Sequence, residues 1–249
     1  MFRRLISSLR HPVRTIAEAR DRLSSSLLSR KVNCLGPGAG IYRRGLRPKV
    51  LIARHPDAEI NLHGKLLVES WHAGTEPIFI SCGPKARLNI RGDFQIGNGV
   101  RIVLAPGAEL DIGGRRDESV SGITESSLIL VRRRVCIGVD FVCAWRVFIT
   151  DCDWHEIVGE INQLDTVIGD HVWIASGASV LKGTRIGSGS ILACGAVAHR
   201  IEIPPNSLAG GVPCRILGSG RQWRRDLPSV GAVCSPCDEL QAARPAHAL

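Results

Sequence analysis

The sequence has few large aromatic side chains and no long apolar run. Aromatic residues make up 4% of the 249 residues, with one Tyr and one Met, whereas Gly occurs 27 times. This composition favours a regular, backbone-dominated architecture over a globular core of large side chains. A transmembrane helix needs about 18 or more consecutive apolar residues, and none is expected here. Residues 1–30 lack the continuous apolar core of a secretory signal, so export is not expected either.

The cysteines lack the even number and the regular spacing of a disulfide framework. There are nine of them, which fits reduced thiols in a cytoplasm better than disulfides. Cys234 and Cys237 have a metal-like spacing, but no second pair in the tail completes four ligands. We interpret this pair as incidental.

Acidic residues are outnumbered by basic ones. The 32 Lys and Arg against 23 Asp and Glu give a formal net charge of +9, which indicates an anionic partner such as a phosphate-bearing cofactor, an acidic glycan or a membrane surface. Charge alone does not choose among them. The basic residues are spread out and lack aromatic interleaving, so a nucleic-acid partner is not expected.

What the sequence does contain is a six-residue repeat. An aliphatic residue recurs at every sixth position of residues 168–192, and a small residue follows it in most hexads. Each hexad can form a short strand and a tight corner, and three hexads make one coil of a triangular prism. Stacked coils then pair strand on strand. The repeat positions are Ile90, Ile96 and Ile102; Val131, Ile137, Cys143 and Ile149; and Ile168, Ile174, Val180, Ile186 and Leu192.

The repeats predict an all-β prism with one interruption. Ile149 and Ile168 lie 19 positions apart, one more than three hexads, so a loop must leave the coil between them. The N-terminal apolar residues have helical spacing and are interleaved with Arg. Such a helix could contact a membrane surface, but a helix that packs on the domain or is frayed is the favoured interpretation. The expected organisation is a basic amphipathic helix at 1–30, irregular or capping coils at 31–75, the β-helix domain at 76–217, and a C-terminal tail ending in disorder at 218–249.

The stretch that contains "IGDHVWIASGASVLKG" and ends in "IPPNSLAGGVPCRIL" resembles a known family. It is similar to the C-terminal half of the hexapeptide-repeat acyltransferases, in the branch of the galactoside and maltose acetyltransferases and the polysaccharide-biosynthesis O-acetyltransferases. The resemblance covers residues 130–217. It implies a left-handed parallel β-helix, a homotrimer, and acetyl transfer from acetyl-CoA to a sugar hydroxyl. A polysaccharide or glycolipid pathway at the cytoplasmic face of a bacterial membrane is the expected setting.

The loop between the two hexad blocks carries the predicted catalytic group. Its sequence "FITDCDWHEI" is similar to the active-site segment of the family, which makes His155 the candidate general base. A hydroxyl attacks a thioester well only when a base removes its proton, and imidazole, with an ordinary pKa of about 6.5, suits this role. Asp153 is the candidate for orienting the ring, whereas Asp151 is interpreted as a solvated carboxylate.

By the same resemblance, six residues match positions that line the groove for acetyl-CoA. Arg200 and Arg215 also suit the phosphates of CoA on chemical grounds, because guanidinium binds phosphate well. For the small residues among the six, plain corner packing is the competing interpretation. The six candidates are Trp173, Ser176, Cys194, His199, Arg200 and Arg215.

Three other functions compete with this one. A zinc enzyme on the same fold needs three His at a subunit interface, and the scattered His residues do not provide the expected spacing, so no metal is expected. Enzymes that N-acylate an amino sugar nucleotide often carry an extra N-terminal α/β domain with a glycine-rich fingerprint. No such fingerprint follows a clear strand in this sequence. A non-catalytic β-helix scaffold predicts that the loop around His155 is dispensable.

Overall fold

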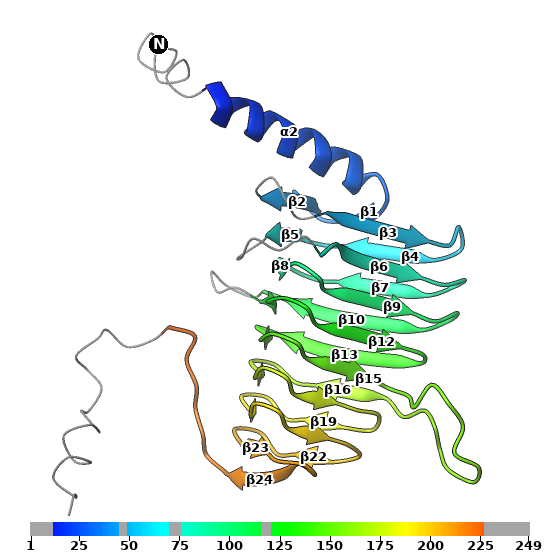
Figure 1. Cartoon of the computed structure of the whole chain (residues 1–249), viewed down its shortest axis with the longest axis vertical. Helices are drawn as coiled ribbons and strands as arrows, with labels where there is room; N and C mark the ends of the chain where they lie inside the picture. The colour runs from blue at the N-terminus through cyan, green and yellow to red at the C-terminus, as the bar shows by residue number, and fades with distance from the viewer. Residues whose placement is uncertain (1–11, 45–48, 70–75, 116–120, 227–249) are drawn as a thin grey trace, which may run out of the picture.

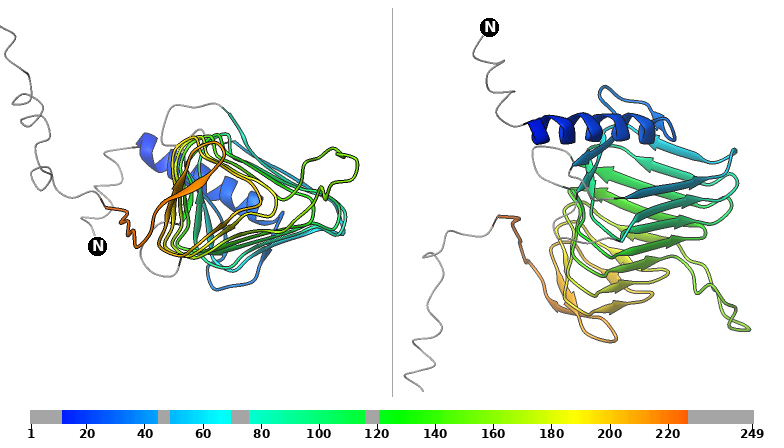
Figure 2. Two further views of the ribbon diagram at one scale, coloured as in Figure 1. Left: turned by 90° about the horizontal axis from the view of Figure 1, so that it is seen from below. Right: turned by 45° about the horizontal axis from the view of Figure 1, so that its top comes forward.

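The chain forms a triangular prism of stacked coils. The computed structural model describes residues 12–44, 49–69, 76–115 and 121–226. Successive strands step from one sheet to the next, so that each coil contributes one strand to each of three sheets. Figure 1 shows the coils stacked along the long axis, and the view along this axis in Figure 2 shows the triangular outline. This is a left-handed parallel β-helix, and the predicted fold class is confirmed.

The three sheets are named A, B and C, and almost all of their neighbouring strands are parallel. Sheet A contains β1 (Asn33–Cys34), β4 (Glu59–Leu62), β7 (Arg87–Ile90), β10 (Glu109–Gly114), β13 (Arg134–Val139), β16 (Thr166–Ile168), β19 (Arg185–Ile186) and β22 (Glu202–Ile203). Sheet B contains β2 (Gly40–Arg44), β5 (Lys65–Glu69), β8 (Phe94–Ile96), β11 (Gly122–Ile123), β14 (Val142–Cys143), β17 (Trp173–Ile174), β20 (Ile191–Leu192), β23 (Leu208–Gly210) and β24 (Arg215–Gly218). Sheet C contains β3 (Val50–Arg54), β6 (Ile78–Cys82), β9 (Arg101–Leu104), β12 (Leu128–Val131), β15 (Phe148–Thr150), β18 (Ser179–Val180) and β21 (Val197–Ala198).

The repeat positions point into the prism, as predicted. The five aliphatic residues of 168–192 have between 0% and 3% of their surface exposed, and the upstream repeat positions are buried as well. The glycines that follow Ile168 and Ile186 lie against the next coil. A Cβ on Gly187, for example, would lie 2.4 Å from the backbone nitrogen of Pro205, so a side chain there would separate the coils. The six-residue pattern therefore determines how closely the coils pack as well as where the chain turns.

The β-helix begins earlier than predicted. Residues 31–75 were expected to form irregular or capping coils, but β1 to β5 occupy the first positions of the same three sheets. The hexad count misses them because these coils are longer. Asn33, Asn61 and Asn89 are hydrogen-bonded neighbours in successive coils and lie 28 residues apart, whereas Asp170 and Ser188 lie 18 apart. The domain boundary expected at residue 76 is corrected to Asn33.

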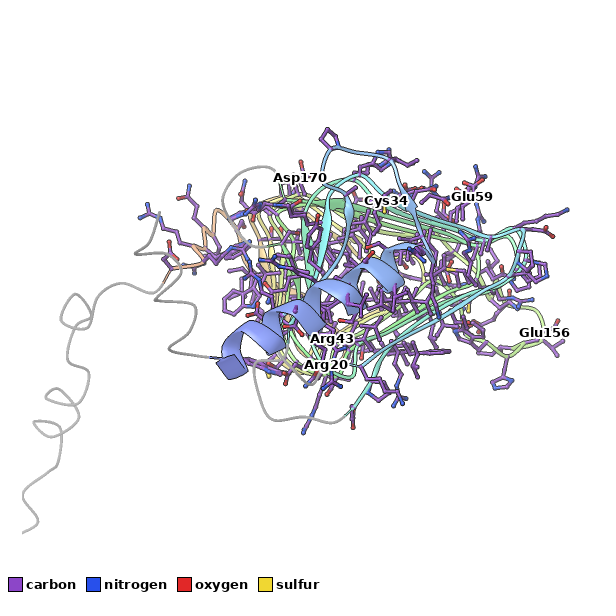
Figure 3. The ribbon with its side chains drawn as sticks, turned by 90° about the horizontal axis from the view of Figure 1, so that it is seen from above. Arg20, Cys34, Arg43, Glu59, Glu156 and Asp170 are labelled. Atoms are coloured by element: carbon purple, nitrogen blue, oxygen red, sulfur yellow. The ribbon has the colours of Figure 1, made fainter. Side chains whose placement is uncertain are left out.

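Helix α2 (Pro12–Ser29) lies across the N-terminal end of the prism, and Figure 3 looks down onto this end. Two of its serine hydroxyls, those of Ser25 and Ser29, accept hydrogen bonds from the backbone N–H groups of Arg43 and Ile41 in β2. The helix thus satisfies part of an open strand edge that would otherwise attract other chains. Residues 1–11 of the predicted N-terminal helix lie outside the described part. Within it, no helix is long and apolar enough to cross a membrane.

The chain reverses direction at the other end. Strand β24 pairs antiparallel with β23, and residues 219–226 then run back along the prism in the direction of its N-terminal end (Figure 1). We call residues 219–226 the C-terminal strap. A tail ending in disorder was expected at residues 218–249, and this is corrected for the strap, which packs against the β-helix through Trp223. Residues 227–249 lie outside the described part.

Loss of an inward side chain should weaken the whole prism. Ile102→Ala should lower the free energy of unfolding by about 2–5 kcal/mol, because a buried aliphatic group is lost and a cavity remains. Leu51→Ala is the matched control, since Leu51 is 40% exposed on β3 of the same sheet. Urea unfolding at a fixed protein concentration measures both. Equal midpoints for the two variants would contradict the inward ladder.

Candidate functional site

The predicted interruption of the β-helix is present as a loop at residues 151–165, which we call the extended loop. It joins β15 of sheet C to β16 of sheet A and stands away from the prism in Figures 1 and 2. Its two limbs pair like a hairpin. Cys152 and Gln163 form an antiparallel bridge, and the Asp153 N–H donates to the carbonyl of Asn162 at 3.0 Å. The loop is therefore an ordered projection from one corner of the prism.

Asp151 anchors the start of this loop. Its side chain is fully buried, and its carboxylate accepts hydrogen bonds of 2.6 to 2.8 Å from the backbone N–H groups of Arg132, Arg133 and Arg134. A carboxylate that accepts three backbone hydrogen bonds can be buried without a large penalty. The interpretation of Asp151 as a solvated loop carboxylate is therefore wrong. It fixes the loop to the turn of the preceding coil.

His155 lies beyond the paired part of the loop and is exposed. Within the described residues, no hydrogen bond joins it to another group. Trp154, just before it, has a left-handed backbone with φ of 62°, and its indole nitrogen donates to the Thr150 hydroxyl at 3.3 Å. The imidazole is thus presented on an ordered segment and is open to an incoming group.

Asp153 was expected to orient the imidazole of His155, but its carboxylate contacts another residue. It accepts a hydrogen bond from the ammonium group of Lys182, whose side chain is 1% exposed. Lys182 also donates to the carbonyl of Ile161 at 2.7 Å. Asp153 therefore attaches the extended loop to the β-helix through Lys182. Pattern reasoning missed Lys182, because a single Lys at a corner position is ordinarily exposed.

A groove of about 750 Å³ lies over sheet B and its corner with sheet C. Its lining is mainly apolar, with Trp145 and Trp173 beside alanines of successive corners. Three of the six predicted donor contacts, Trp173, Ser176 and Cys194, line this groove. Small side chains at the corners leave room for an elongated ligand that runs across the coils.

The other three predicted donor contacts do not line the groove in the single chain. Arg200 donates to the carbonyl of Ile161 at 2.9 Å and so supports the extended loop, and His199 is exposed beside it after β21. Arg215 is exposed on β24, paired with Gly210. Two of the three thus lie at the corner that carries the extended loop.

The C-terminal strap borders the groove on the side opposite the alanine corners. The Trp223 ring stacks on the imidazole of His171, with centroids 4.1 Å apart and planes 7° apart, and its indole nitrogen donates to the His171 carbonyl at 3.0 Å. Asp140 accepts hydrogen bonds of 2.5 Å from both His171 and Arg225. Of the described residues that line the groove, Arg225 alone carries a charge. The sequence gives little indication that the strap packs beside the groove, because the tail shows only one Trp and several Arg without periodicity.

The buried thiols are poor candidates for nucleophiles. Burial raises the pKa of the Cys143 thiol to about 12 and raises the pKa of Cys152 above its ordinary value. Such thiols stay protonated near neutral pH. Cys194, in contrast, is exposed in the groove. In the part of the chain described, no group of three or more His, Cys, Asp or Glu is arranged to hold a metal ion.

Comparison with known proteins identifies the family. The bacterial transferase hexapeptide (six repeats) family matches residues 165–200. The "Putative lipopolysaccharide biosynthesis O-acetyl transferase WbbJ" of Escherichia coli K12 is 31% identical over 146 residues, which cover 51% of this chain and 74% of that protein. The chain therefore belongs to the hexapeptide-repeat acyltransferase family, as the resemblance predicts.

Other relatives match a shorter segment. The galactoside O-acetyltransferase of Escherichia coli K12 is 39% identical over 59 residues, which cover 24% of this chain and 29% of that protein. The chain spans only 27% to 29% of the length of that protein and of two putative acetyltransferases that it also matches. Among solved structures, the polysialic acid O-acetyltransferase OatWY has a TM-score of 0.52 at 18% identity, covering 80% of this chain and 98% of that one. That likeness supports the fold alone.

The strap should detach when its aromatic contact is lost. In Trp223→Ala, trypsin should cleave after Arg221 and Arg224 at least about tenfold faster, because proteolysis follows the population of the open form and the stacking contact is removed. Peptide mass spectrometry over time measures the cleavage. Trp145→Ala, on the other edge of the groove, is the matched control. Equal cleavage rates in the two variants would contradict docking by Trp223.

Proposed function

We propose that the protein is an acetyl-CoA-dependent O-acetyltransferase that acetylates a sugar hydroxyl in polysaccharide or glycolipid biosynthesis. The observation that carries the proposal is the apolar groove, whose corners contain Trp173, Ser176 and Cys194. It occurs in a chain whose relatives are named as O-acetyltransferases of galactosides and of lipopolysaccharide biosynthesis. The extended loop adds a histidine suited to general-base catalysis.

The groove suits the pantetheine arm of CoA. That arm is long, narrow and mostly apolar, and the alanine-rich corners allow it to lie close to the backbone. The phosphates of CoA need cations at one end of the groove. Arg200 and Arg215 are the proposed cations, and His199 is the proposed neighbour of Arg200.

The complete site requires more than one chain. The extended loop leaves the corner between sheets C and A, whereas the groove lies over sheet B. Figure 3 shows Glu156, near the tip of the loop, far from Asp170 at the corner beside sheet B. We infer a homotrimer in which the loop of one protomer reaches the groove of the next, as a closed ring of equivalent contacts. The exposed Ile157, Val158 and Ile161 of the loop are apolar, which suits such a contact.

The chemistry proposed for this site is direct transfer. His155 accepts the proton of the acceptor hydroxyl as the oxygen attacks the thioester carbonyl of acetyl-CoA. The C–S bond then breaks, and the thiolate leaves as CoA, taking the proton back from the imidazolium. No covalent enzyme intermediate is needed, so donor and acceptor are bound together.

The acceptor is proposed to be a glycan or glycolipid precursor at the cytoplasmic face of a membrane. Helix α2 exposes Leu23 and Leu27, with 65% and 53% of their surface accessible. These two side chains lie one helical turn apart, so they share a face that a membrane surface could bind. Peripheral attachment would bring the β-helix close to a lipid-linked acceptor.

Removal of the proposed base tests the mechanism. His155→Ala should lower kcat by about 10²- to 10⁴-fold while leaving the unfolding midpoint nearly unchanged, because the ring is exposed. The assay is mass-resolved transfer of labelled acetyl from acetyl-CoA to a panel of sugars, nucleotide sugars and polyprenyl-linked oligosaccharides. His63→Ala, an exposed His near the N-terminal end of the prism, is the matched control. Full turnover by His155→Ala would exclude His155 as the base.

The groove can be tested without turnover. Saturating desulfo-CoA should slow alkylation of Cys194 by iodoacetamide at least about tenfold, because a bound pantetheine arm covers this thiol. Cys34, which is exposed on β1 at the other end of the prism, should react at an unchanged rate. Residue-resolved mass spectrometry measures both. Equal rates for Cys194 with and without desulfo-CoA would place the donor elsewhere.

The same experiments separate the competing functions. An N-acyltransferase would acetylate an amino sugar nucleotide of the panel and leave the hydroxyl acceptors unmodified. A non-catalytic scaffold would show neither transfer nor protection of Cys194 by desulfo-CoA. Both results can be obtained from the same wild-type preparation, so each alternative has its own signature.

A further inference from the structure

Lys182 occupies an unusual place for a lysine. It follows β18 at the third position of its hexad, in the corner that begins with Val180. The corresponding residues of the following hexads, Ser188 and Cys194, are exposed, as is usual for a corner. Lys182, in contrast, is 1% exposed. It is buried because the extended loop folds over it, so its environment is made by the loop and not by the core of the prism.

Its ammonium group joins both limbs of the extended loop. On the outgoing limb it donates to the carboxylate of Asp153, and on the returning limb it donates to the carbonyl of Ile161 at 2.7 Å. A buried ammonium group without such partners would cost several kcal/mol. The two acceptors on the loop therefore allow Lys182 to be buried. Arg200 donates to the same carbonyl at 2.9 Å and strengthens the attachment of the returning limb.

This contact controls where His155 stands. Asp153 precedes His155 by two residues, and the intervening Trp154 is held by its indole hydrogen bond to Thr150. The position of the imidazole is therefore set by the point at which Asp153 is fixed. Because the carboxylate of Asp153 binds Lys182, it reaches the imidazole only through the backbone.

We propose that Lys182 is a positioning residue for catalysis, which holds the extended loop so that His155 reaches the donor and acceptor. Asp153 acts as its counter-ion and not as the orienting partner of the imidazole. The inference rests on the proposed function of His155. It assigns a role in the reaction to a residue that touches neither substrate.

The test is a double-mutant cycle on Lys182 and Asp153. Lys182→Met keeps a long side chain but removes the charge, and it should lower kcat by about 10- to 100-fold, since a misplacement of about 1 Å can cost as much. The Michaelis constant for acetyl-CoA should change less than about twofold, because the groove is untouched. Asp153→Asn should match this loss, and the double variant should lose no more than either single variant.

The shape of the pH–rate profile separates the two roles of Asp153. If it is the counter-ion of Lys182, the two variants should lose activity to a similar extent. The pKa of the catalytic base read from the profile should then shift in opposite directions, because Asp153→Asn removes a negative charge near His155 and Lys182→Met removes a positive one. If Asp153 orients the imidazole, Asp153→Asn should lose far more activity than Lys182→Met and should shift that pKa alone. This second outcome, or full activity of Lys182→Met, would overturn the proposal.

Hydrogen exchange provides a readout that does not depend on activity. In Lys182→Met, the amides of Asp153 and Leu164, which close the paired limbs, should exchange at least about tenfold faster, while the strands of the β-helix keep their protection. Lys65→Met, at an exposed site on β5, is the matched control. Unchanged exchange in Lys182→Met would refute the anchoring. An inactive wild type would instead contradict the proposed function.

Discussion

The parallel pairing of successive coils around an inward aliphatic ladder is the constraint on which the rest of the structure depends. In sheet A, Ile168 pairs with Ile186 and Ile186 with Ile203, and all three side chains are buried. Strands of two or three residues have no stability of their own, so each coil is held by its neighbours. Because the ladder fixes the register, every outward side chain has a defined height and a defined face.

A stack of this kind tolerates an excursion only where the register is recovered. After the extended loop, Thr166 resumes pairing with Val135 of the preceding coil, so the ladder continues as if no residues had been inserted. The ordering of the loop has to offset its lost chain entropy, and buried charge interactions contribute here. Asp151 binds three backbone amides below the loop, and Lys182 binds both of its limbs. The extended loop is thus held in one conformation by specific contacts, as the coils are.

The periodic features of the fold can be predicted from the sequence, whereas contacts between residues far apart in the chain cannot. The hexads of residues 168–192, the interruption after Ile149 and three residues that line the groove follow from spacing and resemblance. The coils before residue 76 escape because their period is 28 residues in places. The contacts of Lys182 and Trp223 escape because they join residues 29 and 52 positions apart, and no local pattern marks such partners.

The extended loop, the groove and the C-terminal strap lie on different sides of the prism. This separation has a consequence for the regulation of activity. The corner between sheets C and A carries His155, the proposed base, sheet B carries the groove, and the C-terminal strap closes the corner between sheets A and B. Under the proposed function, an isolated chain holds every part of the active site but cannot bring the loop to its own groove. Activity then depends on assembly, and a fixed loop is more valuable than a flexible one. A loop that reaches a second chain must keep its geometry without support from that chain, and the ion pair of the buried Lys182 with Asp153 provides this.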